Sequence, residues 1–122
     1  MWNMVFSVIS GVYAIVIGLG IIGLWIMLLL TKQVPELETE PVAIAFHITA
    51  EIIMGILSLL SGIFLLIDLS WAPYFFILAM GLVIYAVINA VGYYGQRKQW
   101  VFVIMFGIIL IASVSLVILN VF

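Results

Sequence analysis

The sequence predicts an all-α integral membrane protein, a single bundle of four transmembrane helices in an up-down-up-down arrangement. The first observation behind this prediction is composition: of 122 residues, 69% are hydrophobic and only 7% are charged. Soluble domains carry about 25% charged residues, and a chain this apolar lacks the polar surface that a water-soluble globule needs. The second observation is that short polar breaks separate four long apolar runs. A single transmembrane domain, residues 1–122, accommodates all four runs.

The first apolar run predicts a helix over residues 3–30, and its length suits a hydrocarbon core about 30 Å thick. No basic residue precedes this run, and the run is too long for a signal peptide, so we expect it to remain in the chain. Residues 31–40 form the longest polar break, which Pro35 and Pro41 punctuate. Proline is favoured in the first turn of a helix, so Pro41 marks the start of a second helix, residues 41–67.

Two further helices are predicted over residues 72–94 and 100–122. A short turn that contains Asp68 and Trp71 joins the second helix to the third. So short a connection makes these two helices antiparallel neighbours. Gly95 is expected to end the third helix, because glycine readily adopts the left-handed conformation that is common just after a helix.

The basic residues indicate which side of the membrane each loop faces. Lys32 lies in the loop of residues 31–40. Arg97 and Lys98 lie in the loop of residues 95–99, and the sequence has no other Lys or Arg. Four crossings put these two loops on the same side, and positively charged loops favour the cytoplasm. We therefore expect a multi-pass protein of the cell membrane with both loops cytoplasmic and both termini on the non-cytoplasmic side.

Small residues recur at helical spacing along the first predicted helix, where they allow a second backbone to approach closely. We interpret them mainly as packing positions within the bundle, with a dimer face or a cavity wall as the alternative. Because so small a bundle leaves little room for a pore, we also expect a homo-oligomer formed through this helix, or a partner in a membrane complex. The small residues are Ser7, Ser10, Gly11, Ala14, Gly18, Gly20 and Gly23.

The pair His47 and Glu51 is the one strongly polar break inside an apolar run. His47 is the only histidine in the sequence, and Glu51 is the carboxylate that lies deepest in a predicted helix. Residues four apart share a helix face, and this face continues with small and polar residues while the opposite face is aliphatic. A helix in lipid turns such a stripe inward. The stripe consists of His47, Glu51, Met54, Gly55, Ser58, Ser61 and Gly62.

A second polar stripe follows the third predicted helix. At a rise of 1.5 Å per residue, its Asn89 and the facing His47 lie about 9 Å from the cytoplasmic ends of their helices. Tyr85 and Glu51 both lie about 15 Å from those ends. The matched depths predict one buried polar cluster in the cytoplasmic half of the bundle, formed by His47, Glu51, Tyr85 and Asn89. The stripe itself consists of Gly81, Tyr85, Asn89 and Gly92.

Ionisable residues in a membrane interior are costly and usually serve a function. The leading hypothesis is that the predicted cluster binds or transports a small polar solute, an ion or a proton. A hydrogen-bonded staple between Glu51 and either Tyr85 or His47 is the structural alternative. Two other function classes stay open: an accessory or structural subunit of a larger membrane complex, and a membrane enzyme that acts on a lipid or a quinone.

The sequence offers little for enzymatic catalysis or for a metal, so an enzyme is not favoured. It has no Gly-x-Ser-x-Gly motif, no phosphate-binding loop and no Cys. His47 and Glu51 supply two ligands where zinc needs at least three, and a haem held by His47 with Met54 or Met105 is disfavoured because Met is common core filler. Three basic residues and a net charge of −2 give no surface for nucleic acid. We expect no catalytic residue, metal or cofactor, and the lipid bilayer as a partner.

The run from Ala50 to Gly62, in which an acidic residue leads a helix punctuated by glycines, resembles the second helix of DoxX-like proteins. These are small four-helix membrane proteins. Residues 81–100 are also similar to segments of prokaryotic four-helix membrane proteins without an assigned role. His47 is not part of the DoxX-like pattern. The resemblance implies the four-helix architecture and, at most, a respiratory or redox-associated membrane setting.

Overall fold

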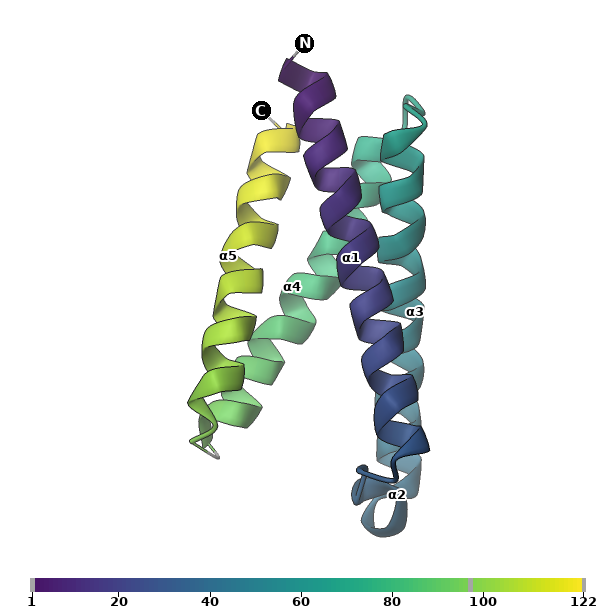
Figure 1. Ribbon diagram of the computed structural model, residues 1–122, viewed down its shortest axis with the longest axis vertical. Helices are drawn as coiled ribbons and strands as arrows, with labels where there is room; N and C mark the ends of the chain where they lie inside the picture. The colour runs from purple at the N-terminus through teal and green to yellow at the C-terminus, as the bar shows by residue number, and fades with distance from the viewer. Residues whose placement is uncertain (1, 97, 122) are drawn as a thin grey trace.

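The computed structural model describes residues 2–96 and 98–121, and every regular element in that part of the chain is an α-helix (Figure 1). Four of its helices are long and apolar enough to cross a membrane, which confirms the predicted all-α class and the four long helices. The long helices are α1, Trp2–Leu30; α3, Pro41–Leu66; α4, Ala72–Gln96; and α5, Trp100–Val121.

Successive long helices run in opposite directions, so the bundle has two different ends (Figure 1). We call one the terminal end, because both chain ends lie there beside the α3–α4 turn, residues 67–71. The other is the loop end, where the α1–α3 and α4–α5 connections lie. Lys32 and Lys98 belong to these two connections and therefore share the loop end.

Two details of the predicted elements are wrong. The polar break of residues 31–40 contains a short helix, α2, Glu36–Thr39, which was not expected. Backbone N–H groups of this turn donate to the carbonyl oxygen of Pro35 and close it. In addition, α4 does not end at Gly95 but continues to Gln96.

The end of α4 is set by Lys98, which adopts the left-handed conformation with a φ of 56°. Its N–H and that of the following residue donate to the carbonyl oxygens of Gly95 and Tyr94, at 3.1 and 3.0 Å. This pair of bonds is the Schellman closure of a helix C-terminus. α1 and α3 close in the same way, with Lys32 and Asp68 as the left-handed residues. Glycine was predicted to end the third helix, at Gly95, whereas all three closures use a charged residue.

α1 and α3 pack backbone against backbone through two pairs of glycines. Gly11 faces Gly62, and Gly18 faces Gly55. A β-carbon added to Gly18 would lie 2.6 Å from the carbonyl oxygen of Gly55, which is closer than real β-carbons approach. The glycines therefore permit a helix separation that no larger residue allows.

These contacts confirm, for Gly11 and Gly18, that the small residues of the first helix serve packing within the bundle. Between the two glycine pairs, Ser58 donates a 2.8 Å hydrogen bond to the carbonyl oxygen of Ala14. Gly20 and Gly23 lie outside this contact, because nothing is within 4 Å of a β-carbon placed on either.

The buried core of the four long helices fills only their terminal half. Buried positions in α1 stop at Gly18, and those in α4 stop at Val87. In α3 they begin at Met54, and in α5 they begin at Ser113. Toward the loop end, α4 leaves α3 and runs beside α5 (Figure 1). The two helix pairs, α1–α3 and α4–α5, are thus held together at the terminal end and diverge toward the loop end.

We expect Gly18→Ala to destabilise the protein and Gly20→Ala to leave its stability unchanged. The methyl group at Gly18 would meet the Gly55 carbonyl oxygen, and overpacking of this kind costs about 1–3 kcal/mol. The same group at Gly20 meets nothing within 4 Å. Thermal unfolding in detergent, followed by circular dichroism, measures the difference. Equal unfolding temperatures for the two variants would show that α1 and α3 are not in backbone contact.

Candidate functional site

α3 places His47 and Glu51 one turn apart, on the face that is buried further along the helix. His47 Nε2 lies 3.0 Å from Glu51 Oε1, a distance that suits an ion pair or a hydrogen bond. The His47 side chain is 57% exposed and that of Glu51 is 23% exposed. From α1, the Trp25 ring packs edge-on against the imidazole, with ring centroids 5.7 Å apart. The structure thus brings together the two residues whose spacing predicted a contact.

The polar stripe of α3 faces inward as predicted, but only in the terminal half of the bundle. His47 and Glu51 lie on the same face but closer to the loop end, where α4 no longer covers α3 (Figure 1). His47 and Glu51 therefore extend the buried stripe onto a part of α3 that is accessible. The members of the stripe that are buried are Met54, Gly55, Ser58, Ser61 and Gly62.

Tyr85 and Asn89 do not join the His47–Glu51 pair in the single chain. Tyr85 is 71% exposed and Asn89 is exposed as well, because α4 buries its opposite face through Val83 and Val87. Among the described residues, no hydrogen bond connects Tyr85 or Asn89 to the pair. The expectation of one buried cluster is therefore wrong for the single chain, since α4 has diverged from α3 at this depth. A functional role for the four residues stays a prediction.

Hydrogen bonds that were not predicted join α1 to α5 in the terminal half of the bundle. The Tyr13 hydroxyl lies 2.8 Å from Ser113 Oγ and donates to the carbonyl oxygen of Ile109 at 3.1 Å. Near the terminal end, Asn120 Nδ2 donates to Ser10 Oγ at 2.8 Å. These contacts close the bundle between its first and last helices.

A signal for these bonds was present in the sequence. Ser10 and Tyr13 lie about one turn apart, and Ser113 and Asn120 lie about two turns apart, so each pair shares a helix face. Each pair is surrounded by aliphatic residues. The spacing indicates two polar faces, but it does not indicate that the first helix and the fourth predicted helix are neighbours.

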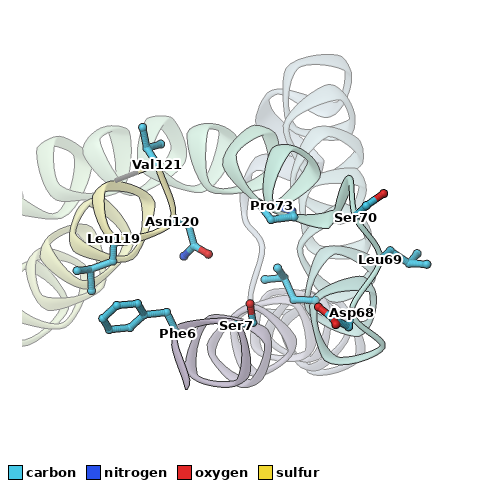
Figure 2. Close-up of a pocket in the computed structure, with 10 residues that line it drawn as sticks. Phe6, Ser7, Asp68, Leu69, Ser70, Pro73, Leu119, Asn120 and Val121 are labelled. Carbon is cyan, nitrogen blue, oxygen red and sulfur yellow. The ribbon is translucent and has the colours of Figure 1, made fainter. Parts of the chain in front are cut away.

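A pocket of about 360 Å³ lies at the terminal end, between all four long helices (Figure 2). Ser7 of α1, Asp68 of the α3–α4 turn and Asn120 of α5 contribute polar groups to it. Phe6 and Leu119 contribute apolar walls. A second pocket, also of about 360 Å³, adjoins the first and extends along Tyr74 and Ile77 of α4. None of these positions belonged to the predicted site.

Two regions can therefore carry chemistry, one in each half of the bundle. The His47–Glu51 pair can exchange a proton or bind a polar group. The terminal-end pocket can hold a small ligand, because its volume lies within the range of about 300–1,000 Å³ that ligand pockets occupy. Within residues 2–96 and 98–121, no three His, Cys, Asp or Glu side chains gather as a metal site would require.

Comparison with known proteins places the chain in a family. A family model described as a domain of unknown function, DUF8058, matches residues 4–122. The match covers nearly the whole chain, so the chain belongs to this family. No curated protein and no solved structure matches it.

We expect Tyr13→Phe to lower stability by about 0.5–1.5 kcal/mol, because the variant loses the hydroxyl that joins α1 to Ser113 and Ile109 of α5. Tyr85→Phe is the matched control, since it removes the same atom from an exposed side chain. Unfolding midpoints of both variants in detergent test the prediction. A Tyr13→Phe midpoint equal to that of Tyr85→Phe would contradict it.

Proposed function

We propose that the chain is a multi-pass protein of the cell membrane that binds or transports a small polar solute, an ion or a proton at the His47–Glu51 pair. The observation that carries this proposal is the 3.0 Å contact between His47 Nε2 and Glu51 Oε1 on a helix that is otherwise apolar and long enough to cross a membrane. Two titratable groups in contact can pass a proton from one to the other.

The depth of the pair supports a functional rather than a merely solvated role. α3 begins at Pro41, so His47 lies about 9 Å and Glu51 about 15 Å along the helix axis from its loop end. A charged side chain at such a depth in hydrocarbon costs several kcal/mol unless it is paired, neutral or near water. The contact between the two side chains offsets part of this cost.

The pair also retains free hydrogen-bonding capacity. Among the described residues, the contact of Nε2 with Oε1 is the one polar interaction of these side chains, so His47 Nδ1 and Glu51 Oε2 stay available. Partial exposure of both side chains gives a solute or a proton donor access to these atoms. Binding of a polar group is the use that such an arrangement supports best.

The proposed sidedness follows from charge. Lys32 and Lys98 lie in the two connections at the loop end, and the one further basic residue of the sequence, Arg97, lies outside the described residues. The positive-inside rule puts these connections, residues 31–40 and 95–99, in the cytoplasm and both termini outside. His47 and Glu51 then lie in the cytoplasmic half of the membrane.

We expect Glu51→Gln to abolish proton flux, because glutamine keeps the size and polarity of the side chain but cannot exchange a proton. The measurement uses protein in liposomes loaded with a pH-sensitive dye, with flux driven by a potassium diffusion potential. Glu38→Gln, which removes a carboxylate from the exposed α1–α3 connection, is the matched control and should keep the wild-type rate. Wild-type liposomes as tight as empty ones, or a Glu51→Gln variant as active as the wild type, would contradict proton transport at this pair.

A second candidate function, a subunit of a membrane complex or homo-oligomer, is favoured by the outer face of α4. Tyr85 and Asn89 are exposed there, and a β-carbon on Gly81 or Gly92 meets nothing within 4 Å. In a lipid environment an amide without a hydrogen-bond partner is unfavourable, and small residues beside it let another helix approach. Contact with another membrane protein would satisfy the amide.

If α4 forms such an interface, Asn89→Leu should release the partner and reduce the mass of the complex in mild detergent, because leucine has no hydrogen bond to offer. Light scattering after size-exclusion chromatography gives that mass. Ile108→Leu, at an exposed position on α5, serves as the control and should leave the mass unchanged. An unchanged mass for Asn89→Leu would count against this interface.

A further inference from the structure

The pocket at the terminal end is lined by polar groups that come from separate parts of the chain. Ser7 of α1, Asp68 of the α3–α4 turn and Asn120 of α5 line it, and so does Ser70 of the same turn, whose hydroxyl points away from the space between the helices in Figure 2. Figure 2 shows the Asn120 side chain reaching from α5 into the space between α1 and the start of α4. This concentration of polar groups is unusual in a chain of which 69% is hydrophobic.

The Asn120 amide and the Asp68 carboxylate offer acceptors to the pocket, beside the Ser7 hydroxyl, which can donate or accept. Both N–H bonds of the Asn120 amide are used, by Ser10 Oγ at 2.8 Å and by the Leu116 carbonyl oxygen at 2.7 Å. Its oxygen Oδ1 is left to accept. Asp68 contributes a carboxylate, which accepts only and carries a negative charge. A ligand that fits must therefore donate hydrogen bonds and favour a negative surrounding.

The charged side chain in the lining also favours a ligand with a positive charge. Among the described residues that line the pocket, Asp68 is the one charged side chain and there is no Lys, Arg or His. Among these lining residues an anionic group would find no cation, and it would be repelled by the carboxylate. From these acceptors and this charge, we propose that the terminal-end pocket binds the protonated amine of a small molecule or of a lipid headgroup.

The backbone conformation at Asp68 is fixed by the closure of α3. Asp68 has a φ of 61° and is the left-handed residue of the α3 closure. Its N–H donates to the Leu65 carbonyl oxygen at 3.2 Å, and the next N–H donates to the Phe64 carbonyl oxygen at 3.2 Å. The backbone that carries the carboxylate is therefore a closed helix end rather than a free loop, so little backbone order has to be gained when an amine binds.

The adjoining second pocket adds an apolar extension to the polar site. The two pockets share Ser70, Pro73, Asn120 and Val121. Beyond these shared residues, the second pocket continues along Tyr74 and Ile77 of α4. Tyr74 is 76% exposed, and Trp71 in the turn is 48% exposed, as aromatic side chains at a membrane interface are. An ammonium headgroup at Asp68 with apolar atoms along α4 fits this shape.

The variant Asp68→Asn isolates the charge, because asparagine tolerates the left-handed conformation and preserves the helix closure. The first probe is free ethanolamine, titrated calorimetrically into protein in a non-ionic maltoside detergent, which has no nitrogen. The second probe is a nanodisc with equal amounts of phosphatidylethanolamine and phosphatidylglycerol, from which native mass spectrometry identifies the retained lipid. Glu38→Gln, at the loop end, removes a carboxylate elsewhere and is the control.

The wild type and Glu38→Gln should bind the amine, and Asp68→Asn should bind it at least about tenfold more weakly. Binding of ethanolamine identifies a soluble amine as a sufficient ligand, and retention of phosphatidylethanolamine alone identifies the lipid headgroup. Neither probe binding to the wild type, equal binding by Asp68→Asn, or preferential retention of phosphatidylglycerol would overturn the proposal. Circular dichroism verifies that Asp68→Asn is folded, and the result is independent of proton flux at Glu51.

Discussion

The approach of the α1 backbone to the α3 backbone is the contact on which the remaining structure depends. Gly11 packs against Gly62, and Gly18 packs against Gly55. In each pair the carbonyl oxygen of one glycine lies close to the place that a β-carbon on the other would occupy. This close approach lets Ser58 reach the Ala14 carbonyl oxygen. In lipid, where no hydrophobic effect drives helices together, close packing and hydrogen bonds of this kind supply the association. The helix pair then forms one wall against which α4 and α5 can pack.

The elements were predictable because their length and apolar character are those of helices that can cross a membrane. A span needs about 20 apolar residues, and prolines and charges mark where each span stops. Which face of a helix lies inward was less predictable. Polar stripes of membrane helices usually turn inward, and the stripe through Tyr85 and Asn89 was assigned to the bundle interior on that rule alone. The structure turns that stripe outward.

The two polar regions differ in how much of the fold they require, which explains why only one was predicted. His47 and Glu51 lie four residues apart, so the helix alone brings them together. The terminal-end pocket needs Ser7, Asp68 and Asn120, which are separated by most of the sequence. The pocket forms only when α1 lies beside α5. The contact between Tyr13 and Ser113 that holds these two helices together joins residues 100 positions apart, so no local sequence pattern indicates it.

The restriction of the buried core to the terminal half has a mechanical consequence. The α1–α3 and α4–α5 pairs are joined at the packed terminal end, so a change in the angle between them pivots there. The part of α3 outside the packed core, residues 41–53, is about 20 Å long, so a rotation of about one degree at the pivot displaces its far end by about 0.3 Å. The His47–Glu51 pair lies on the part of α3 outside the packed core. A change in the angle between the two helix pairs therefore moves the surroundings of His47 and Glu51 most, while the packed end stays fixed.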